Sequence, residues 1–234
     1  MIVLGIETST PQTSIALGTQ TEIVAAARLT GKARHDVVVP ALEDLLRWSG
    51  LELRQIGGVA VGLGPGLFTG LRVGVETGKS LAQVLGVPIV GIGSLDALAF
   101  GVRHAGRLIG AVIDARRGEV FHALYRSVPG GIVRQTDYTV APPDHLAADL
   151  EALREDVLLV GNGAILYRRE LEVGPRVEIG SATTGHPEAA ALVELAVPRL
   201  LREEYDRLYD VVPLYLRKSD AEIAWDQRHR GAPA

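Results

Sequence analysis

The chain opens with a short apolar run rich in β-branched residues, residues 2–6. A polar turn follows at residues 7–11, and an apolar run resumes at residues 13–17. Apolar runs of this length, separated by Ser, Thr and Pro, are typical of strands joined by a turn. The pattern therefore predicts a strand, a tight turn and a returning strand.

The same order of apolar and polar positions recurs about a hundred residues later. Residues 108–113 lead into the polar stretch 114–118, and residues 119–125 alternate as a returning strand. In each copy a carboxylate, Glu7 or Asp114, stands where the first strand ends. Two similar lobes that each open with an acid-tipped hairpin are the layout of actin-like ATPases. We therefore predict an α/β protein with a two-lobed actin-like (ribonuclease H-like) fold and a duplicated lobe.

Helical and strand patterns alternate between the two hairpins. Asp36 can cap a helix that runs to about Ser49, with Gly50 at its end. Its apolar stripe consists of Val38, Leu42, Leu45 and Leu46. A buried strand at 58–63, a helix from Thr69 to about Gly86 and a strand at 87–92 follow. Such alternation predicts a mainly parallel sheet at this end of the first lobe.

The second half of the chain has fewer signals. It predicts a strand at 157–160, which ends in a Gly-Asn-Gly turn, and a helix from about Pro187 to Tyr205. The expected units are an N-terminal lobe at 1–103, a smaller C-terminal lobe at 104–216 and a polar tail at 217–234.

The composition of the chain excludes several classes of protein function. The chain has 234 residues, 47% of them hydrophobic, a net charge of −4 and no cysteine. The acidic balance argues against a protein that binds nucleic acid by itself, because phosphate contacts normally supply much of that affinity. No apolar run is long enough for a membrane helix, so we expect a cytoplasmic protein. Without cysteine there is neither a disulfide nor a thiolate metal site.

Motifs for independent catalysis are weak. Gly78-Lys79-Ser80 resembles the end of a phosphate-binding loop, but the required first glycine falls at Val73 and the segment lies within a predicted helix. The six histidines show no i, i+3 or i, i+4 pair, so we expect no metal site. No G-x-S-x-G motif surrounds any serine. We therefore expect neither a catalytic residue set nor a cofactor.

The hairpin tips are the remaining candidate for a nucleotide cleft. Glu7, Thr8 and Ser9 could face a phosphate or metal, or they could form an ordinary turn. Asp114 stands in the second tip beside Arg116, where a working cleft needs glycine for close backbone approach. These five residues are therefore predicted to form a vestigial cleft that does not bind ATP productively.

Small residues recur every four positions on the second predicted helix. They are Gly70, Gly74, Gly78 and Ala82, so one face carries almost no side chains. Each helix-interior glycine costs up to about 1 kcal/mol relative to alanine, which a close approach must offset. That approach could be to the chain's own sheet or to a helix of another chain. The pattern leaves both interpretations open.

Several segments resemble one specific family. They are 64–74 (GPGLFTGLRVG), 79–82 (KSLA), 6–9 (IETS), 114–120 (DARRGEV), 161–164 (GNGA) and 213–217 (PLYLR). Together they span nearly the whole chain and closely resemble the bacterial TsaB (YeaZ-like) family.

The resemblance implies a non-catalytic subunit of the complex that makes threonylcarbamoyladenosine in tRNA, beside the anticodon. It implies that catalysis belongs to the paralogous subunit TsaD, which carries a His-x-x-x-His pair where this chain has Ser94 and Leu98. It also implies a TsaE ATPase in the same complex, tRNA contact only through partners, and homodimers when TsaD is absent. The partner-binding residues expected on the first and second helices are Leu42, Leu45, Gly70, Leu71, Gly74, Val75, Gly78 and Ala82.

Two enzymatic hypotheses stand beside this one. A small actin-like ATPase or kinase would use Glu7, Thr8 and Asp114. A metal-dependent peptidase-like protein would need a ligand set, which the sequence does not offer.

Overall fold

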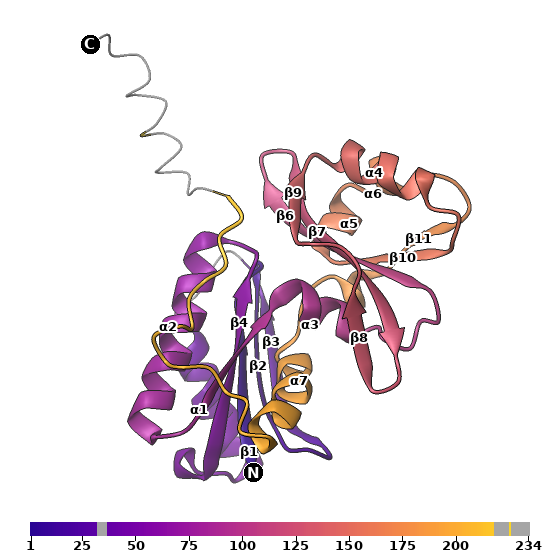
Figure 1. The fold of residues 1–234 in the computed structure, drawn as a ribbon. Helices are drawn as coiled ribbons and strands as arrows, with labels where there is room; N and C mark the ends of the chain where they lie inside the picture. The colour runs from indigo at the N-terminus through magenta and orange to yellow at the C-terminus, as the bar shows by residue number, and fades with distance from the viewer. Residues whose placement is uncertain (32–36, 218–224, 226–234) are drawn as a thin grey trace.

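The computed structural model describes residues 1–31, 37–217 and 225, and it shows two lobes, each built on a β-sheet (Figure 1). The predicted cap Asp36 and almost all of the predicted polar tail lie outside the described residues. The two-lobed α/β prediction is confirmed, and each lobe does open with a hairpin.

The N-terminal lobe contains a five-stranded mixed sheet with the order β3-β2-β1-β4-β5. The first three strands are antiparallel, whereas β1, β4 and β5 are parallel, as the alternation of strands and helices predicts. The strands are β1 (Ile2–Glu7), β2 (Gln12–Gly18), β3 (Ile23–Thr30), β4 (Ile56–Gly64) and β5 (Ile89–Gly93).

Helices cover both faces of this sheet. On one face α1 (Val38–Ser49) and α2 (Phe68–Leu85) pack on inward side chains such as Leu4 and Val61, with the short 3₁₀ turn η2 (Leu53–Gln55) before β4. On the other face α7 (Ala189–Leu201) packs on Val3 and its neighbours. Adjacent strand residues point to opposite faces, so this lobe has two separate apolar cores.

The C-terminal lobe contains a sheet with the order β11-β10-β6-β7-β8, and β9 also pairs with β7. The strands are β6 (Leu108–Arg116), β7 (Glu119–Val128), β8 (Gly131–Arg134), β9 (Thr139–Ala141), β10 (Val157–Val160) and β11 (Val177–Ile179). The shorter elements are α4 (Pro143–Ala152), α5 (Asn162–Leu166), α6 (Arg168–Leu171) and η3 (Ala182–Thr184).

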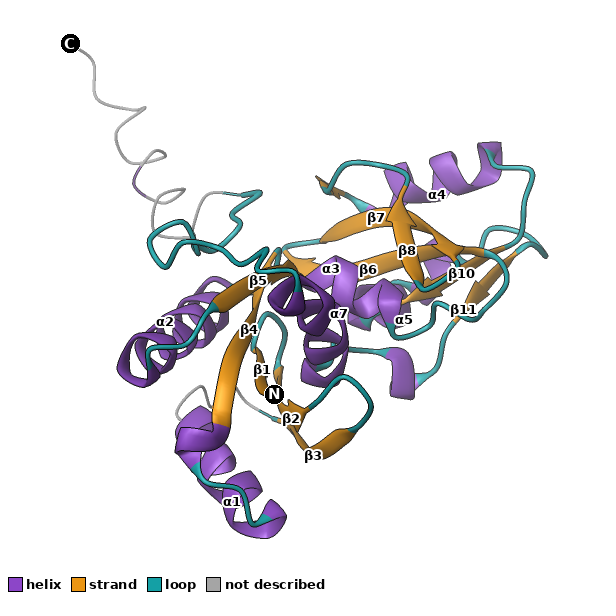
Figure 2. Cartoon of the chain, turned by 60° about the horizontal axis from the view of Figure 1, so that its bottom comes forward, coloured by secondary structure: helices purple, strands orange, loops and turns teal. Residues whose placement is uncertain are grey.

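Two helices pack across the junction between the lobes. The helix α3 (Ser94–Phe100) directly follows a strand of the N-terminal sheet, yet its Leu95 and Leu98 lie in the core of the C-terminal lobe. Conversely, α7 comes late in the chain and packs on the N-terminal sheet. Figure 2 shows both helices at the junction between the lobes.

Residues 202–217 leave α7 and return along the N-terminal lobe past α2 (Figure 1). We call this segment the C-terminal strap. The Asp206 amide donates to the carbonyl of Ile89 at 2.9 Å, and the Leu214 amide donates to the carbonyl of Leu63 at 2.7 Å. The strap therefore runs along the N-terminal lobe and ends beside the tip of the second hairpin, where Arg217 pairs with Glu119.

Candidate cleft and partner-binding face

The first hairpin places its carboxylate inside the protein. Glu7 is fully buried, and its Oε1 accepts a hydrogen bond from the Ser9 amide at 2.7 Å. Its Oε2 accepts one from the Ser94 hydroxyl at 2.8 Å. Burial raises the pKa of Glu7, because removing water disfavours the charged carboxylate. The side chain is therefore a structural group of the interior and is not open to a metal ion in a cleft.

The two threonine hydroxyls of the same tip also bond within the chain. Thr8 donates to the carbonyl of Gly70 in α2 at 2.7 Å. Thr10 lies 3.0 Å from Nδ1 of His186, and both threonines are at most 1% exposed. A phosphate would have to displace buried hydrogen bonds to reach this tip.

The second hairpin has the opposite character. Its tip carries Arg116 at φ 65° and Arg117 at φ 57°, a left-handed conformation that favours glycine. The buried Asp114 accepts a hydrogen bond from the Arg116 amide at 2.8 Å, and the Arg116 guanidinium lies 3.4 Å from the same carboxylate. Side chains occupy the position where close backbone approach to a phosphate would be needed.

These observations correct the idea that the five residues predicted for a vestigial cleft share one opening. Glu7, Thr8 and Ser9 are completely buried. The Arg116 side chain is 57% exposed, and Asp114 pairs with it. A cavity of about 250 Å³ does lie between the lobes, but Arg116 is the only one of the five in its lining.

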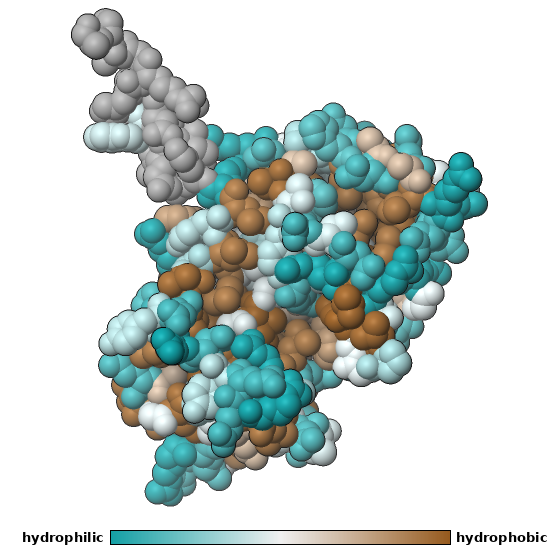
Figure 3. All heavy atoms as spheres, viewed as in Figure 1, coloured by the Kyte–Doolittle hydropathy of each residue, from teal (hydrophilic) through white to brown (hydrophobic). Residues whose placement is uncertain are grey.

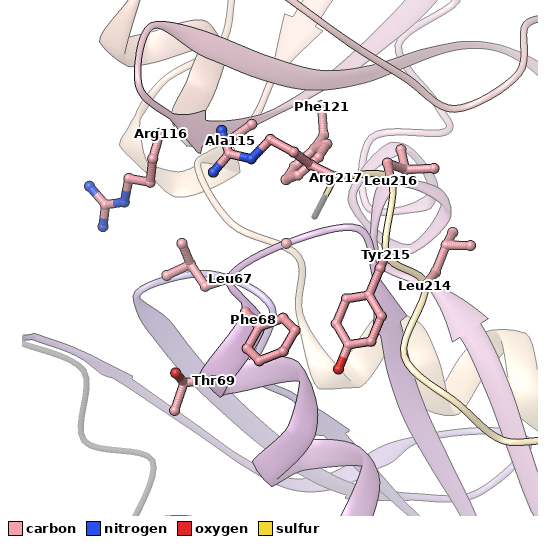
Figure 4. Close-up of a pocket in the computed structure, with 11 residues that line it drawn as sticks. Leu67, Phe68, Thr69, Ala115, Arg116, Phe121, Leu214, Tyr215, Leu216 and Arg217 are labelled. Carbon is pink, nitrogen blue, oxygen red and sulfur yellow. The ribbon is translucent and has the colours of Figure 1, made fainter. Parts of the chain in front are cut away.

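This cavity is bounded by the start of α2, the second hairpin and the C-terminal strap (Figure 4). Phe68 and Tyr215 pack together with ring centroids 4.9 Å apart. The Arg72 guanidinium stacks 3.9 Å from the Phe68 ring and donates to the Tyr215 hydroxyl at 3.0 Å. Across the cavity Arg217 pairs with Glu119 at 2.9 Å. These contacts attach the strap to both lobes.

The small-residue face of α2 points into its own lobe. A Cβ on Gly74 would collide with the Thr8 hydroxyl, and one on Gly78 would collide with Cγ1 of Val61. The eight predicted partner-binding residues are all buried within this chain: Leu42, Leu45, Gly70, Leu71, Gly74, Val75, Gly78 and Ala82. The glycines therefore serve the close packing of α2 on the chain's own sheet, and a role of these residues in partner binding stays a prediction.

A second stripe on α2 remains accessible. Val73, Thr77 and Leu81 each precede a buried small residue by one position, and they are half-buried. Val84 continues this stripe and is 81% exposed. On α1, Val39 and Trp48 are exposed as well. Figure 3 shows hydrophobic side chains reaching the surface along the edge formed by α2. The i, i+4 spacing of Val73, Thr77 and Leu81 was present in the sequence, but the glycine pattern beside it is stronger.

Ser94 and Leu98, the two positions compared with the histidine pair of TsaD, lie on α3 and are buried. Ser94 is fully buried and bonds to Glu7, and Leu98 is 4% exposed in the core of the C-terminal lobe. Among the described residues no group of three His, Cys, Asp or Glu side chains could hold a metal ion. None of the helices described in this chain combines the length and apolar character needed to span a membrane.

Two sheet-based lobes with paired hairpins at their junction define a two-lobed actin-like protein, and comparisons with known proteins agree. The family model of TsaD, tRNA N6-adenosine threonylcarbamoyltransferase, matches residues 27–225. The Bacillus subtilis tRNA threonylcarbamoyladenosine biosynthesis protein TsaB is 34% identical over 233 residues, which covers 96% of this chain and 98% of that protein.

Solved structures agree with this assignment. YeaZ from Pseudomonas aeruginosa has a TM-score of 0.80 and 27% identity, covering 92% of this chain and 99% of that one. A second structure, described as a protein with similarity to peptidase YeaZ from Pseudomonas aeruginosa, has a TM-score of 0.81 at the same identity and coverage. The chain belongs to the TsaB family of tRNA threonylcarbamoyladenosine biosynthesis proteins, which shares the TsaD-like domain.

Proposed function

We propose that this chain supports threonylcarbamoyladenosine synthesis as a non-catalytic subunit that binds a catalytic TsaD-type protein through the exposed faces of α1 and α2. The observation that carries the proposal is the mainly apolar stripe of Val73, Thr77, Leu81 and Val84, of which Val84 is 81% exposed and the others are half-buried. In this proposal, tRNA is held by the partner and a TsaE-type ATPase joins the same complex.

The first support for the proposal is that the candidate site residues already form hydrogen bonds within the chain. Glu7 and Thr8 hold the first hairpin to α3 and α2, so neither is available to act on a substrate. At the two positions compared with metal-binding histidines, Ser94 is a poor metal ligand and Leu98 is none. These features argue against both an ATPase and a metal-dependent peptidase, the class that the description of one Pseudomonas structure mentions.

The stripe also suits a helical partner in physical terms. Side chains four residues apart on a helix form a ridge, which packs into the groove of a second helix. Burying an apolar side chain of this size contributes about 1.5 to 3 kcal/mol, and Val84 has nearly all of that contribution still to gain. Because the inner face of α2 is rigidly packed, the outer face is presented without a cost of ordering the helix on binding.

The test compares two neighbouring substitutions on α2. Val84→Asp should weaken binding of the TsaD protein from the same organism by roughly tenfold or more, since it places a charge in an apolar contact. Gln83→Asp introduces the same charge at an exposed position beside the stripe and serves as the control. Isothermal titration measures both affinities, and thermal melting shows that both variants fold. Equal affinity of Val84→Asp and the parent chain would contradict the docking face.

Catalytic independence is tested separately. We expect the isolated chain to produce no threonylcarbamoyladenosine from threonylcarbamoyl-adenylate and tRNA. In the complete mixture, omitting any one subunit should abolish the product. Turnover by this chain alone would refute the non-catalytic role. Titration with Mg-ATP should show no binding in the micromolar range, which corresponds to a binding free energy of about −8 kcal/mol. A dissociation constant in that range would support the ATPase hypothesis.

A further inference from the structure

A cluster of polar side chains between the lobes has no part in the proposed docking. Its centre is Asp96, in the first turn of α3, the helix that follows a strand of the N-terminal sheet and packs in the C-terminal lobe. The Asp96 carboxylate accepts a hydrogen bond from the Tyr125 hydroxyl at 2.8 Å through Oδ1. It accepts another from the Tyr138 hydroxyl at 2.7 Å through Oδ2. Both oxygens of one carboxylate thus bind residues of the other lobe.

The surroundings make these two bonds strong. Tyr125 belongs to β7 and is completely buried, and burial beside Asp96 raises the pKa of both tyrosines. The two hydroxyls therefore remain protonated donors under ordinary conditions. Hydrogen bonds to an ionised carboxylate are roughly twice as strong as bonds between neutral groups.

Neighbouring residues fit the same arrangement. Arg134 stacks its guanidinium 4.1 Å from the Tyr138 ring and lies 3.9 Å from Oδ1 of Asp96. Gly93 ends β5, and a Cβ there would collide with the Tyr138 hydroxyl. A side chain at this position would keep Tyr138 from the carboxylate. The cluster thus requires residues from β5, α3, β7, β8 and the segment before β9.

We propose that Asp96, Tyr125 and Tyr138 form a clasp that fixes the angle between the two lobes. The clasp lies at the junction helix α3, whereas the C-terminal strap attaches the lobes at the second hairpin. With both attachments formed, the cleft does not open and close around a ligand. The protein is a rigid platform with one lobe orientation, in contrast to the hinged domains that close around their ligands.

The experiment measures the distance between the lobes directly. Because the chain contains no cysteine, Gln20→Cys in the N-terminal lobe and Glu151→Cys in the C-terminal lobe can carry nitroxide labels without other changes. Both positions are exposed. Double electron–electron resonance should show one narrow distance in the parent chain, and Mg-ATP should not change it.

Loss of the clasp should then release the lobes. Tyr138→Phe removes one donor and keeps the ring, and Asp96→Asn weakens both bonds, so each variant should broaden the distance distribution. Amide exchange in α3 and β7 should increase by roughly tenfold for each lost charge-assisted bond. Tyr209→Phe removes a hydroxyl from a side chain that is 88% exposed, and it should change neither result.

The outcomes separate the clasp from a merely stabilising contact. A lower melting temperature with an unchanged distance distribution in both variants would overturn the proposal, because the cluster would then stabilise packing without setting the lobe angle. A shift caused by Mg-ATP in the parent chain would also overturn it. In the double variant, broadening should be less than the sum of the two single effects, since both substitutions remove the same bond.

Discussion

The two hairpins have the same layout but different environments. In the first, Glu7 and Thr8 are fully buried and held by α3 and α2. In the second, Arg116 is exposed and its backbone adopts a left-handed conformation. The difference shows that a duplicated motif does not imply a duplicated site. The first tip is part of the core, whereas the second exposes the Arg116 side chain above a buried Asp114.

The largest expected effect is on the packing of the first hairpin. Gly74→Leu would force a side chain between α2 and Thr8, and such overpacking costs about 3 kcal/mol at the upper end of the usual range. Urea unfolding measures this loss of stability. Glu76→Leu adds the same side chain on the exposed face of α2 and should change stability by less than about 0.5 kcal/mol. Equal stability of the two variants would show that the glycine face is not tightly packed.

A smaller effect concerns the charge of Glu7. Burial raises the pKa of Glu7 in the folded state above its value in the unfolded chain. The protonated side chain therefore contributes fully to folding stability at pH values below the pKa of the unfolded chain. That contribution is lost as pH rises through the folded pKa. Glu7→Gln cannot ionise, and Oε1 can still accept from the Ser9 amide. The stability of Glu7→Gln relative to the parent chain should therefore increase from about pH 5 to about pH 8. A pH-independent difference in urea unfolding would argue against this.

The smallest effect is expected at the second hairpin. Arg116→Gly and Arg116→Ala both remove the guanidinium, but only glycine relieves the left-handed backbone. The glycine variant should be more stable than the alanine variant by about 1 kcal/mol. Thermal unfolding of the two proteins under the same conditions gives this difference. If alanine is equally well tolerated, the tip is not strained.

Local patterns were sufficient for much of the fold. The apolar runs around Glu7 and Asp114 predicted both hairpins, and the stripe of Leu42 and Leu45 predicted α1. These predictions succeed because strand and helix periodicity depend on neighbouring residues. The seven residues of α3 were missed, since a helix of two turns between glycines has too few positions to show a period.

The site was harder to predict, because the sequence of one helix does not show which part of the structure each of its faces contacts. The glycine pattern of α2 is compatible with contact to a partner or to the chain's own sheet, and only the positions of Thr8 and Val61 in space decide between them. Likewise, Asp96 and Tyr138 are 42 residues apart, and nothing in either segment indicates that they meet. The hydrophobic pattern of α7 predicts a buried helix without stating which sheet it covers.

The crossing of α7 has a consequence for the synthesis of the protein. The face of the N-terminal sheet that contains Val3, Ala16 and Ala60 is covered by a helix that begins only at Ala189. At roughly 5 to 20 residues per second, the ribosome completes β5 several seconds before it reaches this helix. During that interval the apolar face lacks α7 and is covered only in part, by Ala97 and Phe100 of α3. The nascent N-terminal lobe is then a natural substrate for chaperones, and a chain released before Ala189 should aggregate instead of folding as an independent domain.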